Sequence, residues 1–248
     1  MRQARILQND VVQSVTIQDQ QPAIAGQFTW LPATNGSVIG LALNNRPLMD
    51  KLAPELTEAP YKNPPKTPVY FFKPVNTHLA HQGAIQIPAN GETAFAGAAL
   101  GIVIGSTARK VKRADAASVI AGYTIVNEVS LAETSYYRPA IKAKCRDTFC
   151  PIGPWVVSAD ELDVSALAIN TYVNGELRQR GNTADLIYSV PEIIEYLSDF
   201  MTLQAGDLII AGTTLREVAL AAGDVVAVEI EGIGRLENTV TLETGAAK

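Results

Sequence analysis

An uncharged stretch of twelve residues, AFAGAALGIVIG (94–105), limits what this chain can fold into more than any other segment. Its length admits either a buried helix or a buried strand. Gly97, Gly101 and Gly105 recur at every fourth position, and the stretch ends in Ile-Val-Ile before the last glycine. Both features favour a strand that is buried on its two faces. The chain is therefore expected to contain a sheet that is covered on both sides.

Runs of β-branched and apolar residues predict further strands. They lie at VVQSVTI (11–17), SVIGLAL (37–43), VYFF (69–72), GYTIVNEVS (122–130) and the alternating C-terminal segments DLIIAG, DVVAVEIEG and LENTVTLE. VYFF is expected to enter the core. The clearest local prediction is a hairpin over residues 167–181, because Asn174-Gly175 is a strong type I′ turn signal.

Few helices are expected. Residues 190–203 predict an amphipathic helix, because Ile193, Ile194 and Leu197 recur at helical spacing. Residues 114–120 predict one or two helical turns with a capping Asp nearby. The prolines between Pro47 and Pro74 disfavour helix and predict an extended surface arm.

Composition places the chain among compact globular proteins. It has 248 residues, of which 47% are hydrophobic and 18% charged, enough for one well-buried domain or two small ones. No domain boundary is visible along the sequence. The predicted elements together indicate one β-rich α+β domain over residues 1–248 with few short helices.

The net charge of -5 excludes whole classes of partner. An acidic chain repels polyanions, so neither nucleic acid nor an anionic membrane is expected as a partner. No apolar run approaches the roughly 20 residues that cross a bilayer, and the start lacks a secretory signal, so a cytoplasmic location is expected. Cys145 and Cys150 could form a disulfide, but two reduced thiols are favoured.

A concentrated positive charge interrupts this acidic chain. The segment YRPAIKAKCRDTFCPIGPW (137–155) contains Arg138, Lys142, Lys144 and Arg146 within nine positions. Such a run is often a solvated surface, but it can also hold a small anion, because Arg offers a planar fork to a carboxylate and Lys a point charge.

Several segments together resemble the fumarylacetoacetate hydrolase family. They are DAASVIAGYTIVNEVS, KAKCRDTFCPIGPWVV, VNGELRQRGNTADLIYSVPEIIEYLSDFMTLQAGDLIIAGT and GDVVAVEIEGIGRLENTV. YKNPPKTPVYFFKPVNT and YYRPAIKAKCRDTFCPIG narrow the similarity to the isomerases/decarboxylases of 4-hydroxyphenylacetate degradation, in their N-terminal repeat or a separate first subunit. The resemblance implies a mixed β-roll, with a strand-and-arm part (1–68) preceding a family core (69–240).

The resemblance also implies a function and a site. The expected reactions are decarboxylation of 5-oxopent-3-ene-1,2,5-tricarboxylate and isomerisation of 2-hydroxyhepta-2,4-diene-1,7-dioate. In the family, the lysine that matches Lys144 points toward the reacting centre. Polar positions that bind the substrate carboxylates match Asn182, Thr183 and Thr213, and the basic residues Arg138, Lys142 and Arg146 are expected to assist them.

The family's metal ligands are not retained. Active members bind Mg²⁺ or Mn²⁺ through a Glu-x-Glu pair and an Asp on the next strand, and these positions here are Gly97, Ala99 and Glu128. One carboxylate is a poor site for a hard divalent cation, so no cofactor is predicted. A His/Glu proton-transfer dyad is also missing, since its positions are Leu48 and Lys51.

Another group could take over proton transfer. His78 is a candidate base near the mouth of the family site, although His78 and His81 are more simply explained as exposed loop residues. Glu128 without a metal could form an ion pair with Lys144 or act as a base with a raised pKa.

Three interpretations stay open at this point. The chain could be a metal-independent decarboxylase or isomerase, a non-catalytic partner of a metal-bearing paralogue, or a regulatory carboxylate-binding module. Another 2-oxo-acid or 1,3-dicarbonyl hydrolase of the same family is a further alternative. The proline-rich arm and the apolar strand suggest oligomerisation, as a homodimer or as a heteromer with the paralogue.

Overall fold

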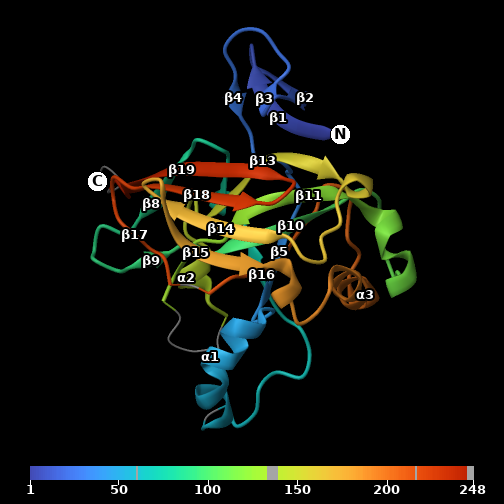
Figure 1. Ribbon diagram of the computed structural model, residues 1–248, viewed down its shortest axis with the longest axis vertical. Helices are drawn as coiled ribbons and strands as arrows, with labels where there is room; N and C mark the ends of the chain where they lie inside the picture. The colour runs from blue at the N-terminus through green and yellow to red at the C-terminus, as the bar shows by residue number, and fades with distance from the viewer. Residues whose placement is uncertain (60, 133–138, 216, 245–248) are drawn as a thin grey trace.

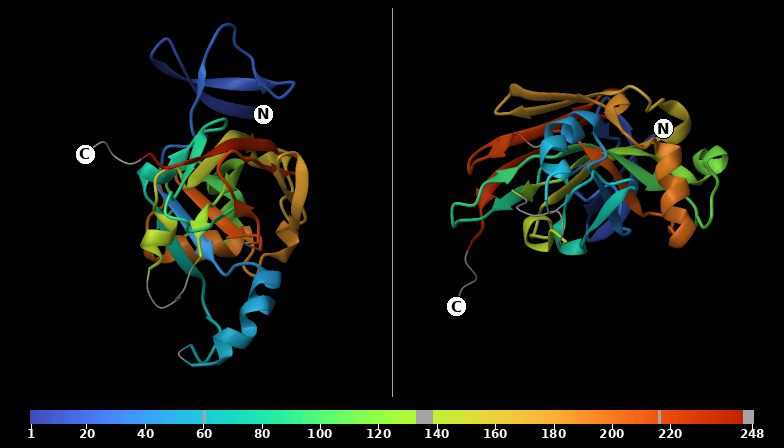
Figure 2. Two further views of the ribbon diagram at one scale, coloured as in Figure 1. Left: turned by 90° about the vertical axis from the view of Figure 1, so that its left-hand side faces the viewer. Right: turned by 90° about the horizontal axis from the view of Figure 1, so that it is seen from below.

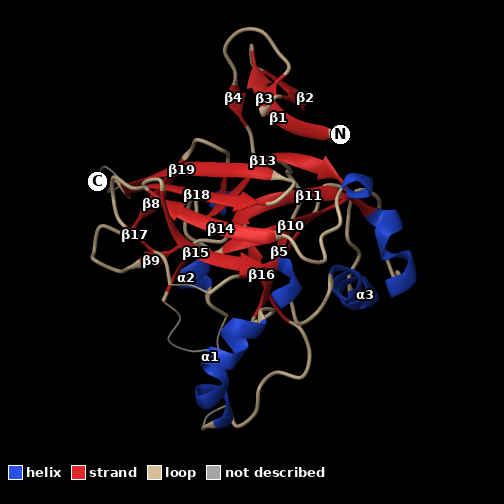
Figure 3. Ribbon diagram, viewed as in Figure 1, coloured by secondary structure: helices blue, strands red, loops and turns tan. Residues whose placement is uncertain are grey.

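A computed structural model describes residues 1–59, 61–132, 139–215 and 217–244 of the chain. In these ranges, strands form a rolled body of mixed sheets, and helices lie around its edge (Figures 1 and 3). This arrangement confirms the predicted β-rich α+β class.

The largest sheet is mixed and contains the predicted apolar strand at its centre. In spatial order it consists of β3 (Gln21–Pro22), β2 (Val11–Gln18), β1 (Arg2–Gln8), β13 (Cys150–Ser158), β11 (Ile120–Asn127), β10 (Ala98–Ile104), β16 (Leu208–Thr213), β5 (Val38–Ala42) and β6 (Val69–Lys73), with β4 (Thr29–Trp30) beside β1 and β7 (His78–Leu79) beside β13. Most neighbours are antiparallel, whereas β16 and β5 run parallel.

β10 is buried at every position, as its lack of polar side chains predicts. It pairs with β11 on one side and β16 on the other. Its apolar side chains are covered within this chain, on one face by a core that includes Ile102 and Ile104 and on the other by one that includes Val103. The burial of this strand therefore needs no partner protein.

Two smaller sheets complete the described strands. One contains β12 (Ser130–Leu131), β9 (Ala94–Phe95) and β17 (Ala219–Leu220); the other contains β15 (Glu176–Asn182), β14 (Ala168–Val173), β18 (Val225–Ile230), β19 (Gly234–Leu242) and β8 (Ala84–Ile87). The hairpin prediction is confirmed, because β14 and β15 pair directly and Asn174 and Gly175 both have positive φ, as a type I′ turn requires.

Helix α3 (Val190–Phe200) confirms the predicted amphipathic helix, although it ends three residues earlier than expected. Ser189 and Glu192 form a capping box at its start, and Ile193, Ile194 and Leu197 are buried. The short 3₁₀ helices are η1 (Val75–Thr77), η2 (Arg113–Val119), η3 (Ala159–Glu161) and η4 (Thr183–Asp185), and α2 (Ile141–Lys144) is a single turn. The residue before η2 is Lys112, whose side chain makes no capping hydrogen bond, and the Arg113 N–H donates to Glu195 instead, so the expected Asp cap is wrong.

The proline-rich arm is only partly extended, so this prediction is wrong over its first half. Residues Arg46–Thr57 form helix α1. Pro47 lies in the first turn, where its missing N–H costs nothing, and the Asn45 side chain accepts a hydrogen bond from the Leu48 N–H. Pro54 is tolerated inside this helix, which projects from the body at the end opposite to the hairpin of β1 and β2 (Figures 1 and 2).

β6 also differs from expectation. It lies at one end of the largest sheet and pairs with β5 alone among the described strands. Phe71 packs against Gly40, and Lys73 is buried, whereas Tyr70 and Phe72 are exposed. The strand thus borders the core instead of entering it. None of the helices in the described part of the chain is long and apolar enough to span a bilayer.

Candidate functional site

The candidate site lies where β10 begins and β11 ends. Two hydrogen bonds join these segments: the Gly97 N–H donates to the side-chain Oδ1 of Asn127 at 2.9 Å, and the Glu128 N–H donates to the Gly97 carbonyl at 2.7 Å. Thr213, at the end of β16, pairs with Ala99 on the other side of β10. Residues far apart in sequence therefore meet at the ends of these neighbouring central strands.

Glu128 is fully buried between two lysines. Its Oε1 lies 2.7 Å from the Nζ of Lys73, and its Oε2 lies 3.2 Å from the Nζ of Lys144. Burying a carboxylate is costly unless opposite charges and hydrogen bonds compensate for the loss of water. The two ammonium groups provide that compensation, and we refer to Lys73, Glu128 and Lys144 as the buried triad.

Besides its ion pair with Glu128, Lys73 connects three segments of the chain through hydrogen bonds. Its ammonium group donates to the carbonyls of Val129 at 2.7 Å, Lys144 at 2.6 Å and Phe149 at 3.0 Å. The side chain has no exposed surface. Because these carbonyls belong to the segment after β11, to α2 and to the segment before β13, Lys73 fixes the walls of the site relative to each other.

Lys144 ends helix α2 and is 3% exposed. Its ammonium group lies 4.5 Å from the centre of the Phe71 ring, where the electron-rich face of the ring attracts a cation. Its contacts with Glu128, at 3.2 and 3.5 Å, are longer than the contact made by Lys73. The sequence analysis expected this pairing of Lys144 with Glu128 as one alternative.

Of the other predicted cations of the basic loop, Lys142 and Arg146 lie within the described residues, and neither joins the buried triad. Lys142 is exposed on α2, and Arg146 pairs with Glu243 at 2.7 Å. The Nε of Arg146 is buried and has no hydrogen-bond partner among the described residues. Arg138 lies outside the described residues. A role of these residues in substrate binding stays a prediction.

The three polar residues predicted to bind the substrate carboxylates lie in two places. The Thr183 hydroxyl accepts a hydrogen bond from the Leu167 N–H, and the Asn182 side chain accepts one from the Ala184 N–H. These two side chains therefore order the backbone around η4. Thr213 lies closer to the triad, because its methyl group would be 3.2 Å from a Cβ placed on Gly97.

Neither histidine is a solvent-exposed loop residue. The Nε2 of His78 lies 3.2 Å from the Lys73 carbonyl, and the Nδ1 of His81 accepts a hydrogen bond from the Glu237 N–H. Burial lowers the pKa of both rings below 6.5. His78 lines a cavity of about 540 Å³ with Lys73 and Asp207, and its role as a base stays a prediction.

The two cysteines are free thiols, in agreement with the favoured prediction. Cys150 is completely buried, which raises its pKa to about 12. Cys145 is partly buried, and burial raises its pKa as well. A thiol with a raised pKa forms little thiolate near neutral pH, so neither residue is an activated nucleophile.

The donor set does not fit a divalent metal ion. Ala99 has no ligating side chain, and a Cβ on Gly97 would lie 2.3 Å from the Glu128 carbonyl oxygen, so a longer side chain cannot enter there without a backbone shift. Both oxygens of Glu128 already face ammonium groups. Across the described ranges, no three His, Cys, Asp or Glu side chains cluster so as to hold a metal ion.

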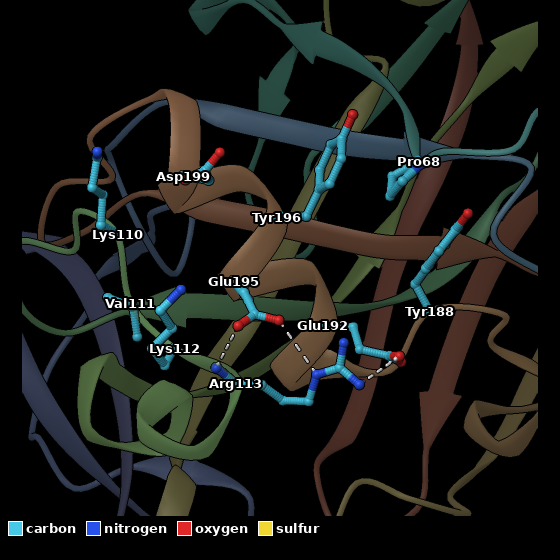
Figure 4. A pocket seen from close by; sticks show the side chains of 10 residues that line it. All are labelled: Pro68, Lys110, Val111, Lys112, Arg113, Tyr188, Glu192, Glu195, Tyr196 and Asp199. Atoms are coloured by element: carbon cyan, nitrogen blue, oxygen red, sulfur yellow. Dashed lines mark hydrogen bonds and ion pairs between the residues drawn. The ribbon is translucent and has the colours of Figure 1, made fainter.

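A second group of charges lines a cavity of about 330 Å³ beside α3 (Figure 4). Arg113 projects between Glu192, at 3.1 Å, and Glu195, at 3.4 Å. Lys110 and Asp199 lie at the same end of this cavity. We refer to Arg113, Glu192 and Glu195 as the Arg113 cluster. All three side chains reach solvent, in contrast to those of the buried triad.

Sequence analysis missed Lys73. One signal was available, because Lys73 follows Phe71 by two positions in VYFFK and therefore shares its inward face if the segment is a strand. A lysine on an inward face needs buried acceptors. The three carbonyls and the carboxylate that supply them come from a region more than 50 residues further along the chain.

Comparison with known proteins places these observations in a family. The chain is 43% identical over 222 residues to a "4-hydroxyphenylacetate degradation bifunctional isomerase/decarboxylase" of Salmonella dublin, a match that covers 88% of this chain and 50% of that protein. The chain thus spans about half the length of this curated relative.

Solved structures are similar over almost the whole chain. A "2-hydroxyhepta-2,4-diene-1,7-dioate isomerase" from Mycobacterium marinum superposes with a TM-score of 0.81 at 30% identity, covering 98% of this chain and 99% of the other. A maleylpyruvate hydrolase from Sphingobium sp. SYK-6, in complex with manganese (II) ion and pyruvate, superposes with a TM-score of 0.71 at 28% identity, covering 88% and 75%.

The sequence match to the family description "Fumarylacetoacetate (FAA) hydrolase C-terminal" extends over residues 37–241. This range contains the whole buried triad and Gly97, Ala99 and Glu128, the positions that the resemblance assigns to the metal ligands of the family. The chain belongs to the fumarylacetoacetate hydrolase family.

Proposed function

We propose that this chain is a subunit of the isomerase/decarboxylase system of 4-hydroxyphenylacetate (homoprotocatechuate) catabolism and that it binds a di- or tricarboxylate at Lys144. The observation that carries the proposal is the 43% identity to a bifunctional isomerase/decarboxylase over 88% of this chain. The substrates concerned are 5-oxopent-3-ene-1,2,5-tricarboxylate and 2-hydroxyhepta-2,4-diene-1,7-dioate.

The geometry favours Lys144 over Lys73 as the ligand-binding cation. Lys73 is fully enclosed and donates to three carbonyls, whereas Lys144 retains slight exposure and makes longer contacts with Glu128. A substrate carboxylate that approaches α2 would meet the Lys144 ammonium first. Such a cation can also stabilise negative charge that develops on a bound 2-oxo acid.

The arrangement disfavours Glu128 as a general base. Both of its oxygens face ammonium groups, and nearby opposite charge stabilises the ionised form of a carboxyl group, which makes it a weaker proton acceptor. In this proposal Glu128 positions the Lys144 side chain, and Lys144 contacts the substrate.

The proposal is tested by calorimetric titration of the purified chain with 2-hydroxyhepta-2,4-diene-1,7-dioate. Lys144→Ala should weaken binding by about tenfold or more, since a charge-assisted hydrogen bond contributes about 1.5–3 kcal/mol. Lys142→Ala, on the exposed side of α2, is the matched control and should change affinity little. Equal affinity of the wild-type chain and Lys144→Ala would contradict a binding role for Lys144.

A second candidate function is that of a non-catalytic partner of a metal-bearing paralogue. The crowding at Gly97 and the absence of a ligating group on the Ala99 side chain support this candidate. The chain also spans only about half of its curated relative, so the remaining half of that relative leaves room for a second unit.

One assay separates the two candidates. Decarboxylation of 5-oxopent-3-ene-1,2,5-tricarboxylate is measured with the chain alone, with Mg²⁺ present and again with EDTA. Turnover that survives EDTA supports a catalytic subunit. Absence of turnover from folded protein, with activity appearing when a metal-bearing paralogue is added, supports the partner role.

A further inference from the structure

The cavity beside α3 is a place separate from the buried triad. One of its walls is α3, and another is the loop of residues 110–113, which follows β10 in the chain (Figure 4). Both walls connect to the end of the β10–β16 pair where Val103 lies opposite Leu208, whereas the triad lies at the end where Ala99 pairs with Thr213. A ligand in this cavity would therefore occupy a second site.

The walls of the cavity are fixed to each other by hydrogen bonds from the loop backbone. The Lys110 N–H donates to the carbonyl of Ser198 at 2.8 Å, and the Val111 N–H donates to the Ser198 hydroxyl at 3.0 Å. The Arg113 N–H donates to the Glu195 carboxylate at 3.2 Å. Ser198 itself is fully buried. Because the loop is held against the helix in this way, a ligand would lose little affinity to the cost of ordering the site.

One side of the cavity is aromatic. Figure 4 shows Tyr188, Tyr196 and Pro68 together on this side. The backbone N–H of Tyr188 donates to Asn44 Oδ1 at 2.7 Å, and the Tyr196 ring lies 5.8 Å from the Phe200 ring, so both tyrosines are held in place. Aromatic side chains pack well against a planar ring in stacked or edge-to-face contacts. This side is therefore suited to an aromatic ring.

The other side of the cavity carries an excess of positive charge. The two carboxylates of the Arg113 cluster are occupied by their arginine. Three further charged side chains line the cavity and form no ion pair with another described residue: Lys110, Lys112 and Asp199. Two cations against one carboxylate leave a positive surplus in a chain whose net charge is -5. A lysine ammonium attracts a carboxylate as a point charge, so this side favours an anionic group.

We propose that this cavity is a binding site for a small aromatic carboxylate. The ring of the ligand packs against Tyr188 and Tyr196, and its carboxylate points toward Lys110 and Lys112. The cavity volume of about 330 Å³ lies within the range of about 300–1,000 Å³ that is usual for small-molecule sites. Because the site is separate from the triad, the inference does not depend on the proposed function.

The test is a titration of the isotope-labelled wild-type chain with phenylacetate, followed through the amide NMR signals. Saturable shifts are expected at Val111, Tyr196 and Ser198 and not at Val129 beside the triad. Acetate, which lacks the ring, and phenethylamine, which lacks the carboxylate, should each bind at least about tenfold more weakly. Acetate or phenethylamine binding as tightly as phenylacetate, shifts confined to the triad, or no saturable shift at millimolar phenylacetate would overturn the proposal.

Variants separate direct contact from long-range charge. Lys110→Glu/Lys112→Glu should weaken phenylacetate binding by about tenfold, and Tyr196→Ala by about threefold or more, with unchanged circular dichroism spectra. Arg178→Glu/Arg180→Glu, at exposed positions of β15, changes the net charge by the same amount and should retain the wild-type affinity. An equal loss in both double variants, or wild-type affinity in both cavity variants, would overturn the proposal. The wild-type titration does not depend on the folding of any variant.

Discussion

The buried triad and the Arg113 cluster have the same arrangement of three charged groups, with the signs of the charges reversed. In the buried triad, one carboxylate lies between two ammonium groups; in the Arg113 cluster, one guanidinium lies between two carboxylates. Glu128 has no exposed surface, whereas the Arg113 side chain is 59% exposed. Water and salt weaken the second cluster, so only the first can determine the shape of the site.

Removing the central linker of the triad should have the largest effect. Lys73→Met leaves Glu128 with fewer opposite charges and removes the ammonium donor from three carbonyls, of which that of Phe149 still accepts from the Val129 N–H. Breaking a buried ion pair in this way costs about 3–5 kcal/mol. Denaturant unfolding measures the loss, and the exposed Lys142→Met is the control, with a change within about 0.5 kcal/mol. A loss below about 1 kcal/mol would show that the triad is dispensable for the fold.

Glu128→Gln should have the second largest effect and lower the free energy of unfolding by about 3 kcal/mol. The amide oxygen of Gln still accepts one hydrogen bond, but it does not compensate two buried ammonium groups. Because Lys73 and Glu128 share one interaction, the double variant Lys73→Met/Glu128→Gln should lose less stability than the sum of the single variants. Strict additivity in this double-mutant cycle would argue against direct coupling between the two residues.

Gly97→Ala tests the triad by crowding, without a change of charge. The added Cβ would lie 2.3 Å from the Glu128 carbonyl oxygen, so the segment that carries Glu128 must move. Overpacking of this kind costs about 1–3 kcal/mol. Thermal unfolding measures the effect, and a variant as stable as the wild-type chain would mean that this segment shifts freely.

His81 contrasts with the triad, because burial favours the neutral form of its ring, whereas the triad residues are paired as ions. Burial lowers its pKa below 6.5, and its surroundings include Trp30, Arg235 and Glu237. The unfolded chain therefore binds more protons as the pH falls below 6.5, so the free energy of unfolding decreases in that range. Unfolding free energies at a series of pH values measure this, and His81→Gln should reduce the pH dependence. His78 contributes in the same direction.

The Arg113 cluster should give the smallest effect. Arg113→Ala removes two surface ion pairs, each of which contributes about 0–1 kcal/mol. The difference from the wild-type chain should disappear at high salt, whereas the effect of Lys73→Met should persist. An Arg113→Ala variant that is destabilised equally at low and high salt would indicate packing by the arginine stem instead of charge.

Sequence patterns predicted the parts of the fold that depend on neighbours in the chain. Asn174-Gly175 fixed the hairpin turn, and the spacing of Ile193, Ile194 and Leu197 predicted α3. The same approach misjudged α1. Pro47 lies in the first turn after the Asn45 cap, where a proline does not break a helix, and the helix also accommodates Pro54 in its interior, against the general tendency.

The site was predictable only in part, for a related reason. The family resemblance indicated Glu128 and Lys144, and the structure brings these two residues together. The position of Lys73 depends on acceptors that are 56, 71 and 76 residues away in sequence, and no local pattern encodes contacts over such distances. The partly buried Arg146 was identifiable by its charge, but its partner Glu243, 97 residues further along the chain, was not.

The absence of space at Gly97 has a consequence for engineering this edge of the site. The Glu128 carbonyl oxygen occupies the volume that the first side-chain carbon of any other residue would need at this position. A carboxylate introduced at Gly97 by a single substitution would therefore collide with the backbone, and a designer would have to change the segment around Glu128 first.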